Sequence, residues 1–298
     1  MKTITFEGCS RAGFYAELGH KIVAPLIDHI VKSFNNKEPL QFRLDFSSSW
    51  LNYQERDRVS IYDQIFQEDN EVQLILPYYG VKQDNWTMIP TSDFHCVNAV
   101  FKRYFSQSAS QVLLKHQLAE RYSITPSQTL AVCYRGTDKY REVPLVDVRR
   151  YIELVDSIMS THTDINRIMI QTDQRQVRDR LMDTFKAQAF YIDEMPVTDS
   201  STAIHALIDK SQRVSFAKTL DCSVRIMAEC HSLVTSLSNV SWAIGAYRND
   251  SNNVYQFARN GRVVQASVDG QHVRPGRRQL FADMEHWFEG LRAWRRRS

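Results

Sequence analysis

The sequence contains 298 residues, of which 43% are hydrophobic, and 37 lysines and arginines against 34 aspartates and glutamates leave a formal net charge of +3. This composition excludes a disordered or fibrous chain, and the length suits two domains of ordinary size. No stretch reaches the roughly 18 apolar residues of a membrane span. The amino terminus, MKTITFEG, lacks the apolar core of a signal peptide. We therefore expect a soluble, cytoplasmic protein.

The first half of the chain shows a mixture of strand and helix patterns. In chain order we expect strands over Met1–Glu7, Gln41–Phe46 and Val72–Pro77, and helices over Phe14–Phe34 and Val97–Arg121. Pro25 predicts a kink in the first helix, because proline removes an intrahelical hydrogen bond. Pro126 and Ser127 mark a linker, so we place a domain boundary near residues 123–128, after an amino-terminal domain of residues 1–125.

The second half alternates regularly between strand and helix patterns. Strands are expected over Thr129–Tyr134, Arg167–Gln171, Ala189–Ile192 and Ser232–Thr235. Helices are expected over Val146–Ser160, Asp173–Ala187, Thr202–Lys210, Ser215–Cys230 and Ser241–Tyr247. Strands that alternate with crossover helices imply a parallel, doubly wound sheet. We assign residues 126–260 to this domain and residues 261–298 to a carboxyl-terminal segment with a basic tail.

The cysteines and histidines show no disulfide or metal-binding pattern. The five cysteines stand at wide, irregular spacings, at Cys9, Cys96, Cys133, Cys222 and Cys230. This arrangement fits a reducing compartment rather than a disulfide framework. No HExxH or zinc-module spacing occurs. We expect neither a bound metal nor a cofactor.

Positive charge is concentrated at the carboxyl terminus, where Arg292 to Ser298 contains four arginines. Such a tail can contact phosphates, nucleic acid or a membrane surface, although cations also suit a solvated helix end. No basic stripe interleaved with aromatic residues occurs elsewhere in the sequence. We expect no nucleic-acid partner, and nucleic-acid association through the tail stays an alternative.

The strand Thr129–Tyr134 ends in Arg135, followed by Gly136, Thr137, Asp138 and Lys139. Ligands of open α/β sheets bind just beyond the carboxyl ends of strands, and the planar fork of arginine suits a diphosphate. We interpret Arg135 as a phosphate clamp for a nucleotide-linked substrate. The alternative is an ordinary turn in which Arg135 pairs with Asp138.

Further polar residues follow the other predicted strands. Ser236, Ser238 and Asn239 come between the last strand and its helix, where free N–H groups favour a phosphate, although Ser238 or Asn239 can also simply cap the helix. Asp173 either caps the next helix or binds a ribose or sugar hydroxyl. Glu142 is a candidate general base for an acceptor hydroxyl, or else a solvent-facing loop charge.

Taken together, these residues resemble one family, the α-1,6-fucosyltransferases. Arg135–Lys139 is similar to the family's Arg-Arg-Thr-Asp-Lys motif, and residues 142–152 resemble its acidic residue and following helix. Gln171 to Asp173 resembles the family's Ala-Thr-Asp, and residues 233–247 resemble its strand, Ser-Ser-Gln-Val loop and helix. Gly13 to His20 is similar to its Gly-aromatic-Gly-x-Gln-Leu-His segment.

The resemblance implies a GT-B fold, in which two Rossmann-like domains face a central cleft. It implies an inverting, metal-independent glycosyltransferase that moves a sugar from a nucleotide-sugar donor to a glycan acceptor. Arg135, Glu142 and Lys139 would be catalytic, with Glu142 as the base. The donor-binding set would be Arg135, Asp173, Asp221, Ser236, Ser238, Asn239 and His20.

The chain also departs from the family pattern. The second arginine of the motif is Gly136, a guanine-reading histidine is replaced by Cys133, and the base-reading aspartate aligns with Cys222 unless a one-residue shift brings in Asp221. GDP-fucose is the donor favoured by the resemblance. Because lost hydrogen bonds to a base are costly, a UDP-sugar, as in a xylosyltransferase, is an alternative. A non-catalytic nucleotide- or glycan-binding module of the same fold is another.

Overall fold

The computed structural model describes residues 2–7, 13–48, 61–74, 94–248 and 251–265. Its carboxyl-terminal part is built on a six-stranded sheet with the strand order β10-β9-β8-β5-β6-β7. Neighbouring strands from β5 to β9 run parallel, and β10 adds an antiparallel edge. The strands are β5 (Thr129–Tyr134), β6 (Arg167–Thr172), β7 (Ala189–Tyr191), β8 (Ser232–Ser236), β9 (Val254–Phe257) and β10 (Val263–Gln265).

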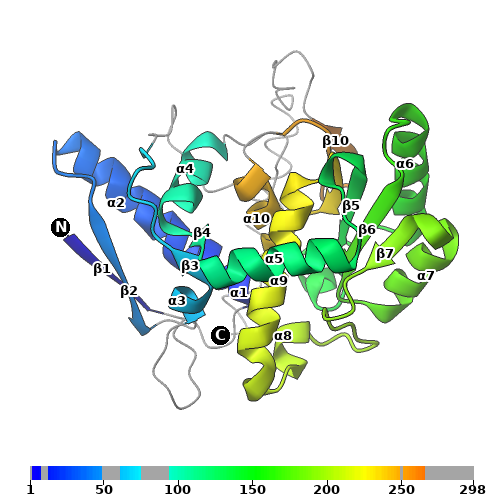
Figure 1. Cartoon of the computed structure of the whole chain (residues 1–298), viewed down its shortest axis with the longest axis horizontal. Helices are drawn as coiled ribbons and strands as arrows, with labels where there is room; N and C mark the ends of the chain where they lie inside the picture. Colours follow the sequence, from blue (N-terminus) through cyan, green and yellow to red (C-terminus); the bar gives the residue numbers. More distant parts are fainter. Residues whose placement is uncertain (1, 8–12, 49–60, 75–93, 249–250, 266–298) are drawn as a thin grey trace.

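Counted from β5 as the first strand, this order is 3-2-1-4-5-6, the doubly wound arrangement of dinucleotide-binding folds. The predicted parallel sheet is therefore confirmed. The helices that connect its strands are α6 (Val148–Thr161), α7 (Arg175–Phe185), α8 (Ile204–Leu207), α9 (Arg213–Glu229) and α10 (Asn239–Arg248). In Figure 1, α6 and α7 lie on the outer side of the sheet, and α9 and α10 lie on the side toward the amino-terminal half.

The residues of β5 are all buried, and alternate side chains enter two different cores. Leu130, Val132 and Tyr134 pack with the apolar faces of α6 and α7. Ala131 and Cys133 belong to the core beneath α9 and α10. Because successive side chains of a strand point to opposite faces, a strand covered on both sides shows the continuous apolar run seen here.

The amino-terminal half contains a parallel pair of strands, β1 (Lys2–Glu7) and β2 (Phe42–Ser48). The chain between them forms α1 (Phe14–Glu17), a π-helical turn over Leu18–Val23 and α2 (Ala24–Asn35). The π-helical turn directly precedes the position of the predicted kink at Pro25, and the Ala24 N–H donates to the carbonyl of Gly19. Pro25 then lies in the first turn of α2, where a missing N–H is tolerated.

The long helix expected over Val97–Arg121 is two helices, α4 (Phe94–Tyr104) and α5 (Ala109–Arg121). Between them, β4 (Ser106–Gln107) pairs antiparallel with β3 (Phe66–Gln67), which follows α3 (Ile61–Ile65). The Ser108 N–H and hydroxyl donate to the carbonyls of Ile65 and Gln64, and these bonds hold the break in place. The single-helix prediction was wrong because these partners are distant in the sequence.

Other predicted elements agree with the structure only in part. Only Ile204–Leu207 of the predicted helix Thr202–Lys210 is α-helical, and β9 and β10 were not predicted. In the predicted strand Val72–Pro77, Val72 lies in a bend and the next two residues have no regular structure, while 75–77 lie outside the described residues. Met1 and residues 266–298, with the basic tail, also lie outside them.

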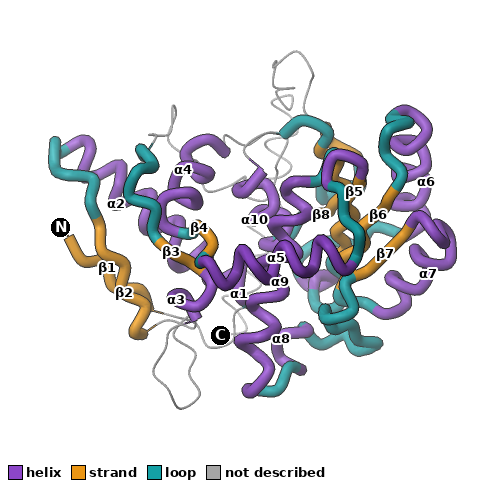
Figure 2. The backbone as a smooth tube through the Cα atoms, viewed as in Figure 1, coloured by secondary structure: helices purple, strands orange, loops and turns teal. Residues whose placement is uncertain are grey.

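One hydrophobic core joins the two halves of the chain. It contains Ile4 and Leu26 from the amino-terminal half, and Leu233 and Trp242 from the sheet domain. Helices α4 and α5 pack on α10 and α9, respectively. Figure 2 shows β1 and β2 at the end of the molecule opposite β6 and β7, with helices filling the space between. The boundary near residues 123–128 stays a prediction.

Candidate functional site

The predicted phosphate residues meet where the strand order reverses. β5 and β8 are neighbours at the centre of the sheet, and Cys133 pairs with Thr235 at their carboxyl ends. The chain leaves β5 toward β6 and leaves β8 toward β9, so the connections diverge at this point. Such a switch point is where open α/β sheets place their ligands. Arg135 follows β5 and Ser238 follows β8, so both lie at this edge.

Asp173 organises the loop after β5. Its Oδ1 accepts a hydrogen bond from the Gly136 N–H at 2.9 Å, and its Oδ2 accepts one from the Thr137 hydroxyl at 2.7 Å. Nη1 of Arg135 lies 3.1 Å from the same Oδ2. The Asp173 side chain is 3% exposed. A buried carboxylate with three donors is satisfied, so Asp173 fixes the loop rather than capping α7 or standing free for a ribose.

Gly136 suits the close packing of this loop. A Cβ atom here would lie 2.2 Å from Oε1 of Gln174 and 2.8 Å from a ring carbon of Tyr134. Any side chain would have to displace both neighbours. This crowding gives a physical reason for glycine at the motif's second position.

The guanidinium of Arg135 is held at one end more firmly than at the other. Nη2 lies 3.4 Å from the carboxylate of Asp138, at the outer limit of a hydrogen bond. Asp138 is also more exposed than Asp173, with 30% of its side chain accessible. The structure therefore contains the pairing of Arg135 with Asp138 that was the alternative to a phosphate clamp. A phosphate could replace Asp138 at Nη2 while Asp173 keeps Nη1 in position.

Lys139 and Glu142 form an ion pair in the same loop, across a short 3-10 turn over Lys139–Arg141. The lysine is buried, whereas 57% of the Glu142 side chain is exposed. The loop from Arg135 to Glu142 carries three cations, Arg135, Lys139 and Arg141, and two carboxylates, and Asp173 beneath it supplies a third carboxylate. Glu142 is accessible to an incoming hydroxyl, and the positive charge of the loop is balanced once Asp173 is counted.

The segment after β8 forms a capped helix start. The Ser238 hydroxyl accepts a hydrogen bond from the Ser241 N–H at 3.0 Å, which makes Ser238 the N-cap of α10. Its hydroxyl also lies 2.6 Å from the Ser241 hydroxyl, which in turn lies 2.6 Å from that of Thr235. These buried hydroxyls satisfy one another, so the helix start would meet a phosphate mainly with backbone N–H groups. Ser236 and Asn239 lie beside the cap and are half-buried.

A small cavity of about 30 Å³ lies next to Arg135. It is lined at the sheet by Cys133, Gln171 and Asp173, and α9 and α10 contribute Leu220 and Val240. Burial raises the pKa of the Cys133 thiol to about 11, so this thiol is uncharged at neutral pH. A space of this size holds about one water molecule. A nucleotide would therefore occupy the surface in front of the cavity.

Asp221 lies elsewhere. It is 0% exposed on α9, and its carboxylate accepts hydrogen bonds from Arg225, Tyr15 and Tyr247, as well as from the amides of Gln107 and Gln111. None of these five residues lines the cavity beside Arg135. With its oxygens used inside the protein, Asp221 joins the two halves of the chain. The structure gives no support for its predicted contact with the donor.

His20 lies in the π-helical turn, and its side chain is outside the described part of the structure. Its neighbours show that this segment reaches the sheet domain. A Cβ on Gly19 would lie 3.0 Å from the Trp242 ring on α10, and one on Gly13 would lie 3.2 Å from the His205 ring. The segment therefore packs beside α10, the helix that Ser238 caps.

Three side chains contribute to this site through contacts that the sequence pattern did not predict. Thr137 lies in the recognised motif, but its bond to Asp173 depends on the register of β5 against β6. Ser241 and Thr235 complete the hydroxyl group under the helix start. Within the described residues, no three metal-ligating side chains come together, and no helix there is both long and apolar enough to cross a bilayer.

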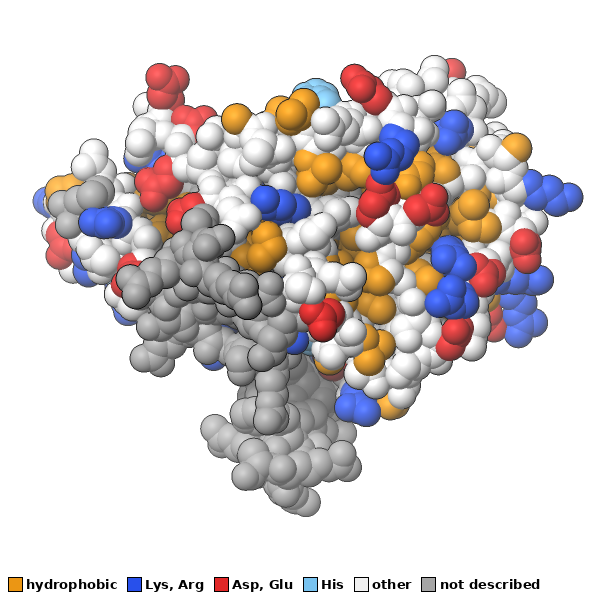
Figure 3. Space-filling model, turned by 60° about the horizontal axis from the view of Figure 1, so that its bottom comes forward, with side chains coloured by type: hydrophobic (Ala, Val, Ile, Leu, Met, Phe, Trp, Pro, Cys, Tyr) orange, Lys and Arg blue, Asp and Glu red, His pale blue; other side chains and the backbone are white. Residues whose placement is uncertain are grey.

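On the face shown in Figure 3, positive and negative side chains of the described residues alternate, with hydrophobic groups between them. This visible surface carries mixed charge rather than a continuous basic stripe.

No family model matches the sequence, and no curated protein matches it. Among solved structures, the fold is similar to NodZ α-1,6-fucosyltransferase soaked with GDP-fucose, with a TM-score of 0.56 and 11% identity over 89% of this chain and 99% of that chain. Fucosyltransferase NodZ from Bradyrhizobium gives a TM-score of 0.56 at 10% identity, with the same coverages. The expected likeness to the α-1,6-fucosyltransferase fold is thus confirmed across both halves of the chain.

Proposed function

We propose that this protein is a glycosyltransferase that moves a sugar from a nucleotide-sugar to a hydroxyl group of a glycan, with inversion and without a metal. The observation that carries the proposal is the placement of Arg135. Its guanidinium is oriented by Asp173 at the switch point of the sheet, beside the capped start of α10. The NodZ structures, one soaked with GDP-fucose and one co-crystallised with GDP, support the same fold for such chemistry.

In the proposed reaction, the donor diphosphate binds between Nη2 of Arg135 and the N–H groups at the start of α10. The acceptor oxygen attacks the anomeric carbon, the bond from that carbon to the diphosphate oxygen breaks, and Glu142 takes the hydroxyl proton. Negative charge that develops on the diphosphate is stabilised by groups already in position, so no reorganisation is needed at the moment of reaction. Lys139 orients the Glu142 carboxylate through their ion pair.

GDP-fucose is the donor we propose first, because the sequence resemblance points to it. Cys133, in place of the family's guanine-reading histidine, makes a UDP-sugar the second candidate. The thiol is buried and neutral, so it offers a base only a weak hydrogen bond.

A thermal-shift panel of GDP, UDP, ADP and their sugar conjugates tests the donor. A ligand at a hundred times its Kd stabilises the folded state by about 2.7 kcal/mol, so the cognate nucleotide should raise the Tm measurably. Arg135→Ala should abolish this shift, whereas Arg149→Ala, which removes an exposed arginine paired with Asp147, should not.

Turnover separates an enzyme from a binding module. Glu142→Gln should lower kcat about 100-fold or more while the donor shift persists, since a general base contributes roughly 10² to 10⁴ in rate. If Arg135→Ala retains near-normal transfer, the clamp assignment is wrong. If nucleotides bind but no transfer occurs with any acceptor, the non-catalytic module is the better description.

A further inference from the structure

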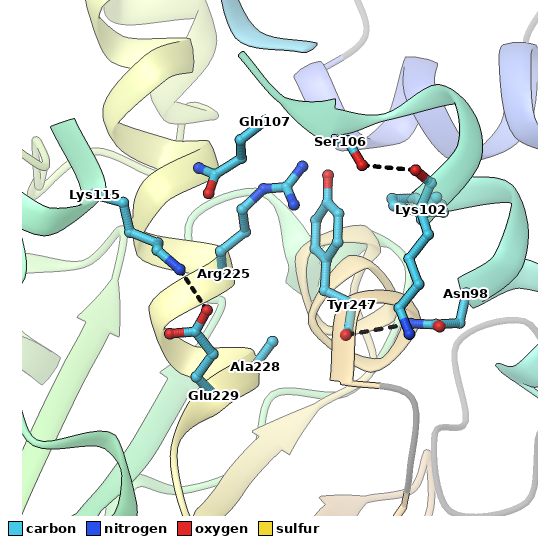
Figure 4. A pocket seen from close by; sticks show the side chains of 10 residues that line it. Asn98, Lys102, Ser106, Gln107, Lys115, Arg225, Ala228, Glu229 and Tyr247 are labelled. Atoms are coloured by element: carbon cyan, nitrogen blue, oxygen red, sulfur yellow. Dashed lines mark hydrogen bonds and ion pairs between the residues drawn. The ribbon is translucent and has the colours of Figure 1, made fainter. Parts of the chain in front are cut away.

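A second, larger cavity lies at the other end of α9 and α10. The amino-terminal parts of these helices, with Leu220 and Val240, border the small cavity beside Arg135. Their carboxyl-terminal parts, with Arg225 and Tyr247, border a separate cavity of about 170 Å³. For comparison, an engineered cavity of about 150 Å³ admits benzene. The opposite wall comes from α4, β4 and α5, so both halves of the chain line this cavity (Figure 4).

Three cations line the cavity, one each from α4, α5 and α9: Lys102, Lys115 and Arg225. Lys115 forms an ion pair with Glu229, and Figure 4 shows this pair on one side of the opening. Within the described residues, Lys102 forms no ion pair. Counting Asp221 behind Arg225, the group has three positive and two negative charges, so one positive charge is left over.

Arg225 is fixed in the wall of this cavity. Its Nε lies 3.0 Å from Asp221, its Nη2 donates to the Phe105 carbonyl at 2.5 Å, and its guanidinium stacks on the Tyr247 ring at 3.9 Å. Nη1 makes no hydrogen bond to any residue that the structure describes. A rigid guanidinium with one nitrogen still unused is pre-organised to bind an oxyanion.

From this geometry we infer that the cavity between α4, α5, α9 and α10 binds the phosphate group of a small phosphate monoester. The phosphate would lie between Lys115 and Nη1 of Arg225, and it would take the place of Glu229 as the partner of Lys115. Figure 4 shows Lys102 on the other side of the Tyr247 ring, and its flexible side chain would swing toward the phosphate from there. The volume leaves room for a few further atoms. Because the ligand would contact both walls, it would also tie the two halves of the chain together. The inference does not depend on the proposed transferase activity.

Isothermal titration of the full chain with inorganic phosphate and with glycerol 3-phosphate, at constant ionic strength in chloride buffer, tests the site. Lys102→Gln should weaken binding roughly fivefold, the effect of one unit charge at about 4 Å in water. Glu229→Gln should tighten binding, because it removes a carboxylate and frees Lys115. Both side chains are exposed enough for these variants to fold. Lys32→Gln, which removes an exposed lysine on α2, is the matched control and should change nothing.

The same titrations are repeated with the Arg135→Ala variant, in which phosphate no longer binds at the switch point. Failure of one site can then be distinguished from failure of the other. The site is supported if phosphate still binds to the Arg135→Ala variant, and if Lys102→Gln weakens this binding while Glu229→Gln tightens it. Absence of binding at millimolar phosphate overturns it. Binding that neither variant alters also overturns it, since the anion would then be held elsewhere.

Discussion

Nη1 of Arg135 lies 3.1 Å from the carboxylate of Asp173, and the two residues directly follow the adjacent parallel strands β5 and β6. The aspartate is almost fully buried, whereas 20% of the arginine side chain is exposed. The buried partner therefore sets the direction of the exposed one. Asp173 therefore positions the loop, whereas Arg135 is the residue that would touch the donor.

Asp173→Asn should weaken both the loop and the donor site. The amide cannot accept from Arg135, Gly136 and Thr137 at once, and an unsatisfied buried group costs about 1–3 kcal/mol. We expect a loss of that size in urea unfolding and a drop of at least about tenfold in donor affinity. Asp199→Asn, at an exposed aspartate paired with Arg175, is the control and should change neither value. Unchanged donor affinity in Asp173→Asn would show that the loop does not need this carboxylate.

Asp138→Asn should have the opposite effect on the donor. Asp138 holds Nη2 of Arg135 only at 3.4 Å, and it competes with an incoming phosphate. Removing its charge should leave the free energy of unfolding within about 0.5 kcal/mol, as for most surface substitutions, and should keep or tighten donor binding. Titration with the donor found in the thermal-shift panel measures this. Weaker binding would mean that Asp138 itself contacts the ligand.

Gly136→Ala should destabilise the protein by about 1–3 kcal/mol, because the new Cβ overlaps Gln174 and Tyr134. Since the closest contact is the Gln174 side chain, the double variant Gly136→Ala/Gln174→Ala should recover part of the loss. Urea unfolding of the two single variants and the double variant gives the coupling energy. Additive effects would show that the Gln174 side chain is not the obstacle.

Asp221→Asn should be among the most destabilising single changes. Arg225 would remain buried without its ion partner, and breaking such a pair costs roughly 3–5 kcal/mol. Asp221→Leu combined with Arg225→Met should be more stable than Asp221→Asn, because it buries no lone charge. Thermal and urea unfolding test both. A loss below about 1 kcal/mol for Asp221→Asn would contradict the structural role assigned here.

Because the Cys133 thiol is buried, we expect the free energy of unfolding to depend on pH in alkaline solution. Burial raises the pKa of its thiol from 9.0 to about 11. Between these values the unfolded chain loses the proton while the folded protein keeps it, so stability falls as the pH rises. The slope is at most about 1.4 kcal/mol per pH unit.

Cys133→Ser removes this thiol and keeps a hydrogen-bonding group beside Thr235. Between pH 9 and pH 11, the unfolding free energy of the wild type should therefore fall more than that of Cys133→Ser. Urea unfolding at intervals across that range measures it, and parallel profiles for the two proteins would rule the effect out.

The parts of the fold that local pattern determines were predicted well. β5 was expected at Thr129–Tyr134 and has those bounds, because a strand buried on both faces shows an unbroken apolar run. The break between α4 and α5 could not be predicted in this way. It depends on the pairing of Ser106–Gln107 with Phe66–Gln67, about forty positions earlier in the chain.

The candidate site shows the same division. The placement of Arg135 and Ser238 at strand ends follows from the alternating pattern, and the N-cap role of Ser238 was one of two alternatives considered. For Asp173, sequence alone suggested a cap or a ribose contact, and the structure shows a third role. The reason is that its three donors lie across a strand pair, which only the sheet register brings together.

The contact between Gly19 and Trp242 gives the protein a built-in optical reporter. Trp242 is the one tryptophan among the residues that the structure describes, and its ring lies against the backbone of the amino-terminal half. Separation of the two halves would change the surroundings of this indole while β5 and β6 remained paired. The sequence has five tryptophans, so the signal of Trp242 is the part of the near-ultraviolet dichroism that Trp242→Phe removes. A change in that part that precedes the loss of far-ultraviolet signal would record undocking as a step distinct from unfolding of the sheet.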